Sequence, residues 1–290
     1  MGTAGKGHEA LNLIHPDLLP RLDPKFISLY NPHVGKTPNK PVDLAVLRKI
    51  YSRAPAPAKH PGNFDIRIYV PNGDRLSGGW PLHINLHGGG WGLGGLDTES
   101  PILRHICVKA SVVVIDVAYR LVSEFVYPTG SMIVFAALQY AVSNPTTFSI
   151  NPDIISLGGI SVGANIALII NHVARDGSIP IKAVVVGTPQ IADISQVPTA
   201  ADSPNPAGKE MEFAPTLNWA RLNLTVIITA DCDPMRDEGE PYAAKLKEAG
   251  NELVLNRFQS VPHPFMHMDD ALDQAKDFIE DRIRYVRCIR

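Results

Sequence analysis

The stretch SLGGISVGANIALII, residues 156–170, places three glycines and Ser161 between a short apolar run and a longer one. Residues 159–163 fit the pattern G-x-S-x-G, in which a tight turn between a strand and a helix raises the serine hydroxyl above the sheet edge. The flanking glycines permit a backbone approach that a Cβ would block. Neither a dinucleotide-binding G-x-G-x-x-G nor the Gly-Lys-Ser/Thr ending of a phosphate loop is present. The stretch alone therefore indicates either a nucleophilic serine or a structural turn.

The segments around this turn alternate between strand and helix patterns. Period-two alternation and short, continuously apolar runs predict strands, whereas a 3.6-residue period predicts helices. The predicted strands cover residues 64–70, 81–87, 111–117, 153–159, 181–187, 223–230 and 252–258. The predicted helices cover residues 132–142, 162–174, 240–250 and 269–286. This alternation predicts an α/β fold with a mostly parallel central sheet and helices on both of its faces.

The regions outside this alternation predict the domain organisation. We expect residues 1–55 to form an N-terminal cap or arm and residues 56–290 to form the main domain. Within the arm, residues 43–51 have helical periodicity, and the following APAPAKHPG, residues 54–62, is typical of an extended linker. Residues 188–222 are rich in Pro, Ala, Ser and Asp, which favours an irregular connecting or lid-like segment.

The composition excludes several classes of protein. The chain has 290 residues, of which 45% are apolar and 19% charged, as in ordinary globular proteins. Its net charge of −2 argues against nucleic acid or an anionic membrane surface as a partner. The three cysteines, Cys107, Cys232 and Cys288, are too far apart to indicate a disulfide framework or a metal site. No signal peptide or apolar run of membrane-spanning length is visible, so we expect a soluble cytoplasmic protein without membrane insertion.

A second glycine-rich stretch, HGGGWGLGG at residues 87–95, follows the predicted strand 81–87. Successive glycines let several backbone N–H groups turn toward one point, which is what an acyl-transfer enzyme needs to stabilise an oxyanion. The alternative is a flexible glycine loop without a chemical role. Trp91 within this stretch is a candidate for the substrate pocket or for ordinary packing. A His-Gly-Gly-Gly run upstream of G-x-S-x-G favours the oxyanion interpretation.

A serine nucleophile also needs a general base and an acid that orients it, and the expected chain order is Ser, Asp or Glu, then His. The acid candidates Asp231, Asp233 and Asp237 follow the strand at 223–230, and their positions favour the first two. The base candidates His263 and His267 follow the last predicted strand. The residues alone leave both choices open.

Taken together, these motifs resemble the hormone-sensitive-lipase-like esterases, a branch of the α/β-hydrolases. The resemblance runs from about residue 64 to the C-terminus. It rests on HGGGW, on YRL at 119–121 with Glu124 and a Tyr-Pro pair behind it, on the serine turn, on DPMRDEGEPYAAKL at 233–246, and on HPF at 263–265. It implies an α/β-hydrolase fold with an N-terminal cap segment.

The resemblance implies a role for each candidate catalytic residue. The nucleophile is Ser161, the acid is the aspartate before proline, Asp233, and the base is His263, which leaves His267 in a supporting or surface position. The oxyanion donors are expected to be the N–H groups of Gly88, Gly89 and Val162. The residues expected to contact the substrate are Trp91, Ile160 and Tyr119.

The serine turn departs from the family pattern G-D-S-A-G, because Ile160 replaces the acid and Val162 replaces the alanine. We expect the bulkier Val162 to narrow the pocket or slow turnover. The family's DYRLAPE is AYRLVSE here, and residues 188–222 are shorter than is typical, so we expect altered or more open access to the site.

These features predict a serine carboxylester hydrolase that cleaves small to medium acyl esters through an acyl-enzyme. The partner is a small-molecule ester, no metal or organic cofactor is implied, and a homodimer is left open. One alternative is an acyltransferase or lactone-processing enzyme of metabolite biosynthesis. Another is a non-catalytic small-molecule binder, although such receptors in the family typically lose the histidine that is present here as His263.

Overall fold

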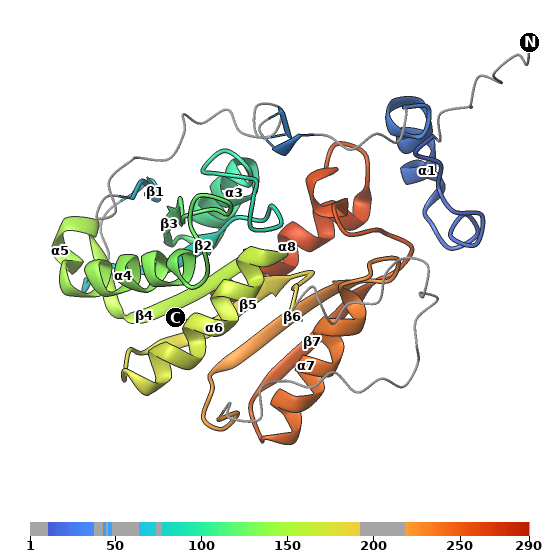
Figure 1. Cartoon of the computed structure of the whole chain (residues 1–290). Coiled ribbons are helices and arrows are strands. Elements are labelled where there is room, and N and C mark those ends of the chain that lie inside the picture. The colour runs from blue at the N-terminus through green and yellow to red at the C-terminus, as the bar shows by residue number, and fades with distance from the viewer. Residues whose placement is uncertain are drawn as a thin grey trace, which may run out of the picture.

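A computed structural model describes residues 11–37, 43–44, 46–47, 64–73, 77–191 and 218–289. Its core is a seven-stranded sheet in the order β1-β3-β2-β4-β5-β6-β7, in which only the pairing of β1 with β3 is antiparallel (Figure 1). The strands are β1 (Ile66–Tyr69), β2 (Trp80–Leu86), β3 (Val113–Val117), β4 (Ile150–Ile160), β5 (Ile181–Gly187), β6 (Leu224–Ala230) and β7 (Leu253–Phe258). The predicted parallel sheet is therefore confirmed, and each predicted strand is present.

Helices cover both faces of the sheet, as predicted. One face packs against α4 (Thr129–Ser143), α6 (Val162–Asp176) and α7 (Arg236–Glu248), which contribute to one hydrophobic cluster with the sheet. The other face packs against α3 (Ser100–Ala110) and α8 (Asp273–Arg287). Figure 1 shows α6 and α7 on the near face. Four shorter elements are α1 (Pro24–Tyr30), the π-helix η1 (Asn31–Gly35), α5 (Pro145–Phe148) and the 3₁₀-helix η3 (Phe265–His267).

The described part of the N-terminal arm packs against the main domain near the ends of β6 and β7. Leu22 and Phe26 belong to the same hydrophobic cluster as α3 and α8. The Asp23 N–H donates to the Ser260 carbonyl at 2.8 Å, and the Asp23 carboxylate accepts from Gln274 Nε2 at 2.8 Å. The arm is thus attached to the segment that carries His263.

Several predicted segments fall wholly or partly outside the described residues. The linker at 54–62 lies outside them, as does most of the predicted helix at 43–51, of which residues 44, 46 and 47 are helical. Residues 192–217 of the irregular segment also lie outside them. Within the described part of the chain, no helix has the length and apolar character needed to cross a membrane.

The parallel strands place the chemistry at one edge of the sheet. The carboxyl ends of parallel strands meet at the same edge, which is where open α/β sheets bind their ligands. The serine turn follows β4, Asp233 follows β6 and His263 follows β7. Residues far apart in the sequence therefore converge there.

Candidate active site

Ser161 lies on a strained turn between β4 and α6. Its backbone angles are φ 58° and ψ −121°, a combination that costs a non-glycine residue about 1–3 kcal/mol. The turn is held by the Ser161 N–H, which donates to the Gly187 carbonyl at 3.0 Å. The side chain, 8% exposed, faces a cleft at the end of the sheet. The sequence pattern therefore forms the sharp turn that it predicts.

Two glycines make this turn possible by allowing contact with the end of β2. A Cβ at Gly163 would collide with the Leu86 carbonyl oxygen. A Cβ at Gly159 would lie 2.6 Å from that same oxygen. Both distances are shorter than real Cβ contacts, so the pattern needs glycine on each side of Ser161.

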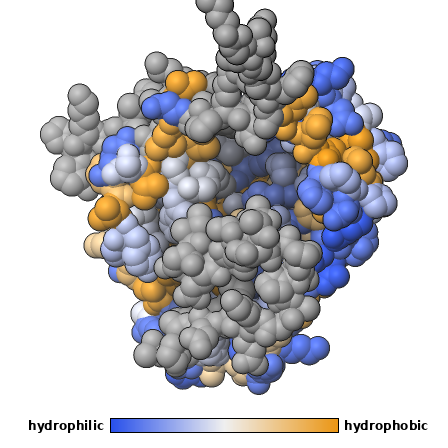
Figure 2. Space-filling view, turned by 45° about the vertical axis from the view of Figure 1, so that its right-hand side comes forward, coloured by the Kyte–Doolittle hydropathy of each residue, from blue (hydrophilic) through white to orange (hydrophobic). Residues whose placement is uncertain are grey.

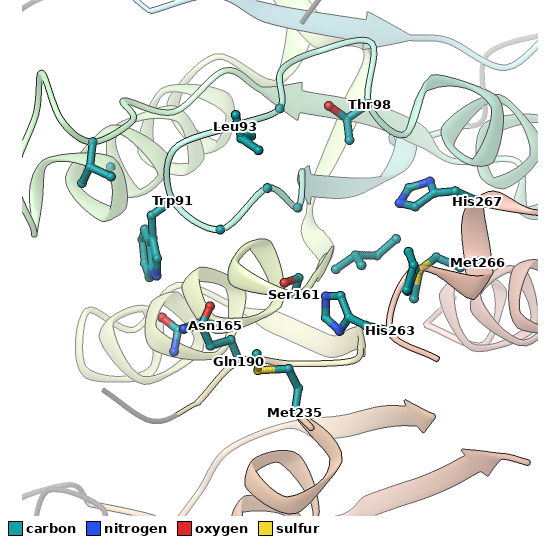
Figure 3. A pocket seen from close by; sticks show the side chains of 18 of the residues that line it. Trp91, Leu93, Thr98, Ser161, Asn165, Gln190, Met235, His263, Met266 and His267 are labelled. Atoms are coloured by element: carbon teal, nitrogen blue, oxygen red, sulfur yellow. The ribbon is translucent and has the colours of Figure 1, made fainter. Parts of the chain in front are cut away.

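His263 and Asp233 form a hydrogen-bonded pair beside Ser161. His263 Nδ1 lies 2.8 Å from Asp233 Oδ2, and Asp233 Oδ1 accepts the Met235 N–H at 2.9 Å. Because a carboxylate only accepts, Nδ1 carries the proton and Nε2 is left with its lone pair. Figure 3 shows the His263 imidazole next to the Ser161 side chain. This arrangement can remove a proton from the serine hydroxyl.

The other two acid candidates are directed elsewhere. Asp231 Oδ1 lies 3.1 Å from Arg236 Nη1 and 3.5 Å from Arg21 Nη2. Asp237 Oδ1 accepts from Arg236 Nε at 2.9 Å. These carboxylates therefore hold the loop after β6 and its neighbours together, while Asp233 faces the histidine.

The glycine loop at residues 87–95 presents its backbone differently from the sequence-based expectation. The Gly88 N–H donates at 2.8 Å to the carboxylate of Glu99, which is fully buried and does not line the cleft. The Gly88 carbonyl accepts from His87 Nδ1 at 2.7 Å. The expectation that the Gly88 N–H faces the substrate is therefore wrong, because Glu99, which precedes α3, already accepts it.

The next N–H groups of the loop remain available for an oxyanion. The C=O and N–H of a trans peptide point in opposite directions, so a Gly88 carbonyl held by His87 directs the Gly89 N–H the other way. Within the described part of the chain, the N–H groups of Gly89 and Gly90 have no hydrogen-bond acceptor. The Val162 N–H lies in the first turn of α6 and has no partner in its own helix. Gly89 and Gly90 line the cleft and Val162 directly follows Ser161, so these three N–H groups are the candidate donors.

The cleft has a volume of about 1820 Å³ and extends to both sides of Ser161. In Figure 3, Trp91, Gln190 and Met235 lie on one side, and Thr98 and His267 lie on the other. Figure 2 shows a hollow on this side of the molecule with hydrophobic residues along parts of its rim. Apolar lining residues that the sequence analysis missed are Leu93, Val122, Phe125, Val126, Tyr127, Ile191, Met235, Met266 and Met268. They come from separate loops, and no local pattern marks them.

Comparisons with known proteins agree with this geometry. A family model described as the alpha/beta hydrolase fold matches residues 83–213 and 200–267. An AB hydrolase superfamily protein of Schizosaccharomyces pombe is 30% identical, with 90% of this chain and 92% of that protein covered. The chain belongs to the hormone-sensitive-lipase-like esterase branch of the α/β-hydrolase family.

Two further similarities concern this hydrolase family. Carboxylesterase NlhH of Mycobacterium tuberculosis is 30% identical to the hydrolase, with 70% of this chain and 71% of the relative covered. The crystal structure of a vibralactone cyclase has a TM-score of 0.77 and 25% identity, with 97% of this chain and 98% of that chain covered. Proteins named for different activities therefore share the architecture of this chain.

The expected substrate contacts of the hydrolase are only partly found. Trp91 and Ile160 line the cleft, although Ile160 is 2% exposed and packs mainly into the core. Tyr119 does not line it: its ring stacks on His87 with centroids 4.3 Å apart, and its hydroxyl donates to the His87 carbonyl at 2.7 Å. The assignment of Tyr119 to the substrate is therefore wrong, and the residue supports the glycine loop instead.

Val162 also differs from its expectation. Its side chain is fully buried and is absent from the lining of the cleft. The predicted narrowing of the pocket by this residue is not found, because the helix turns the side chain into the core. Burial lowers the pKa of His87, which keeps the imidazole beneath the loop in the neutral form that donates to Gly88.

Proposed function

We propose that this hydrolase cleaves carboxylic esters through a covalent acyl-enzyme on Ser161. His263 Nε2 takes the proton of the Ser161 hydroxyl as its oxygen attacks the ester carbonyl, and the imidazolium then protonates the leaving alcohol. Water repeats the sequence and releases the acid. The observation that carries the proposal is the 2.8 Å pair of His263 and Asp233 beside a serine on a strained turn.

We assign the stabilisation of the negatively charged oxygen of the tetrahedral intermediate to the N–H groups of Gly89, Gly90 and Val162. Gly89 and Gly90 line the same cleft as Ser161, Val162 directly follows it, and none of the three N–H groups has an acceptor in the described part of the chain. Removing one such donor typically raises the barrier by about 2.7–4 kcal/mol. This assignment retains Gly89 and Val162 from the sequence analysis and replaces Gly88 by Gly90.

The cleft supports esters with apolar groups on both sides of the carbonyl. Lining residues lie on both sides of Ser161, so one side of the cleft receives the acyl chain and the other receives the alcohol (Figure 3). The lining is mostly apolar, and its polar side chains include the charged Asp97, Arg104 and Arg120 as well as Thr98, Asn165 and Gln190. Small to medium acyl chains fit this volume, and the relative NlhH is named a carboxylesterase.

Hydrolysis of p-nitrophenyl esters with acyl chains of increasing length tests the proposal. The wild type is expected to release p-nitrophenol, and Ser161→Ala is expected to reduce release to the background rate. A fluorophosphonate probe should add its mass to Ser161 alone, as read by peptide mass spectrometry. Equal rates for the two proteins, or labelling at another residue, would contradict the proposal.

Acyl transfer to an alcohol is a second candidate, favoured by the similarity to a vibralactone cyclase over 97% of this chain. In that case an alcohol replaces water as the acceptor of the acyl group, and the product is an ester or a lactone. Product analysis with added alcohols distinguishes the two. A ratio of ester to free acid well above the ratio of alcohol to water would favour transfer.

A further inference from the structure

A cluster of buried polar side chains lies behind the glycine loop and takes no part in the proposed chemistry. Its members are Asn85 on β2, Asp116 on β3, Glu99 immediately before α3, and Arg282 on α8, and each is 0% exposed. A buried ion costs several kcal/mol unless it is paired and hydrogen-bonded. Three ionisable side chains and an amide, buried together from four separate parts of the chain, therefore require an explanation.

Glu99 is the member that contacts the loop. Its Oε1 accepts the Gly88 N–H at 2.8 Å, and its Oε2 accepts from Asn85 Nδ2 at 3.1 Å. Arg282 Nη1 lies 3.9 Å from the same Oε2, and Arg282 Nη2 donates to Asn85 Oδ1 at 3.0 Å. One carboxylate thus receives a loop amide, a side-chain amide and a cation. A carboxylate suits these three donors, because both of its oxygens accept hydrogen bonds.

The charges in the cluster favour Glu99 as the counter-ion of Arg282. Asp116 Oδ1 accepts from Asn85 Nδ2 at 3.1 Å, but burial raises the pKa of Asp116 well above its usual range and favours its neutral form. Burial lowers the pKa of Arg282, and Glu99 is the foremost group that opposes this effect. The charge of Arg282 is therefore balanced chiefly at Glu99.

Glu99 and Tyr119 hold opposite ends of one peptide group. The His87 carbonyl accepts the Tyr119 hydroxyl at 2.7 Å, and the N–H of the same peptide is the one that Glu99 accepts. The following peptide directs the Gly89 N–H toward the cleft. Without Glu99 the Gly88 N–H would be a buried donor without an acceptor, which costs about 1–3 kcal/mol. Rotation of the peptide toward the cleft would relieve that cost and displace Gly89.

We propose that Glu99 is a positioning residue for the oxyanion hole: with Arg282 as its counter-ion, it withdraws the Gly88 N–H from the cleft and thereby fixes the direction of the Gly89 N–H. The inference rests on the proposed acyl-enzyme function and adds a group to it that never touches the substrate. Its effect is on the rate of the chemical step, because the oxyanion is absent from the bound ester and develops in the transition state that leads to the tetrahedral intermediate.

Two double variants separate positioning from core stability. Glu99→Leu with Arg282→Met removes both charges and the acceptor of the Gly88 N–H, whereas Glu99→Gln with Arg282→Met removes both charges but keeps an acceptor. The leucine variant should lose about 10- to 100-fold in kcat with KM within about twofold, and the glutamine variant should regain at least half of that loss on a logarithmic scale. The leucine variant should lose affinity for a trifluoromethyl ketone, whose adduct carries the oxyanion, by the same factor as kcat.

Asp116→Asn is the control for disturbance of the cluster, since Asp116 has no contact with the loop among the described residues. It should keep kcat within about threefold of the wild type. Wild-type kcat in the leucine variant, equal losses in the two double variants, or an equal loss in Asp116→Asn would overturn the proposal.

A measurement on the wild type covers the case in which the variants do not fold. In ¹H–¹⁵N spectra the Gly88 amide should be protected from hydrogen exchange, and ketone binding should shift Gly89, Gly90 and Val162 more than Gly88. A Gly88 amide that exchanges freely and shifts as much as Gly89 would overturn the proposal. Ester hydrolysis that survives Ser161→Ala would instead contradict the proposed function. The two failures can be told apart, because hydrogen exchange at the Gly88 amide is measured without any catalysis.

Discussion

His263 Nδ1 lies 2.8 Å from Asp233 Oδ2, although the residues follow two different strands and are 30 positions apart in the chain. Asp233 is 3% exposed, and its other oxygen is occupied by the Met235 N–H. The carboxylate is thus fixed in direction and fixes the tautomer of the imidazole. Among the described residues, this is the hydrogen bond that orients the His263 ring.

Asp233→Asn should therefore reduce kcat by about 10⁴-fold, because the amide can donate to Nδ1 and turns the proton of the ring toward the serine. The stability should change little, since the shape of the side chain is kept. Steady-state hydrolysis of p-nitrophenyl butyrate and thermal unfolding measure the two effects.

Asp231→Asn is the matched control two residues away. Asp231 contacts Arg236 and Arg21 rather than the histidine, so its variant should keep kcat within about threefold of the wild type. Similar losses in the two variants would mean that Asp233 is not the specific partner of His263.

The turn around Ser161 should not tolerate a side chain at Gly163. A Cβ there would collide with the Leu86 carbonyl, so Gly163→Ala must move the serine turn away from the glycine loop. We expect a loss of stability above about 3 kcal/mol and a loss of kcat above 100-fold in whatever folds. Gly177→Ala at the end of the same helix is the control: its nearest contact would be 3.3 Å and its φ is −84°, so stability should change by less than about 1 kcal/mol. Urea unfolding of both variants decides the comparison, and equal losses would contradict it.

The strands could be predicted because parallel strands that are buried on both faces have short, continuously apolar sequences. Residues 181–187 match β5 in full, and the other strands differ by at most three residues at either end. Helix α3 was missed, although its buried residues Ile102, Ile106 and Ala110 repeat every four positions. It comes soon after a glycine-rich loop and has a proline in its first turn, so its sequence resembles a continuation of the loop. Proline is nevertheless well accommodated in the first turn of a helix.

The site residues that directly follow strands could be predicted from the sequence. Those whose positions depend on contacts between distant parts of the chain could not. Ser161, Asp233 and His263 follow strands in a fixed order, which makes them visible in the sequence. The direction of the Gly88 N–H depends on Glu99, which directly precedes α3 and reaches the loop because α3 packs against β1 and β3. The position of Tyr119 beneath His87 likewise arises from strand pairing. Neither has a local signal.

Tyr119→Phe should weaken the glycine loop without removing its packing. The phenyl ring keeps the stack on His87, but the buried His87 carbonyl loses its donor. We expect kcat to fall about 3- to 10-fold at unchanged KM, as one net hydrogen bond of about 0.5–1.5 kcal/mol allows. Tyr242→Phe is the control, because its hydroxyl lies 3.1 Å from His172 Nε2 outside the cleft. It should lose similar stability and no kcat, and a comparable fall in its kcat would remove the role assigned to Tyr119.

Buried His83 should make the hydrolase less stable in acid. It lies on β2 with an exposed fraction of 0% and its Nδ1 2.8 Å from Ser156 Oγ, and burial together with Arg282 lowers its pKa well below the usual value. Below a pH of about 6.5 the unfolded chain binds a proton at this position that the folded protein does not. The contribution is therefore fully present above that pH and is lost as the pH falls, by about 1.4 kcal/mol per pH unit.

His83→Gln removes this proton from both states, so the free energy of unfolding should fall less steeply between pH 6 and pH 5 than in the wild type. The difference in slope should be about 1.4 kcal/mol per pH unit, whatever the variant costs at neutral pH. Urea unfolding of both proteins across this range measures it. Parallel lines for the wild type and His83→Gln would mean that the imidazole is protonated in the folded protein, which requires an acceptor or water at its Nε2 within the core.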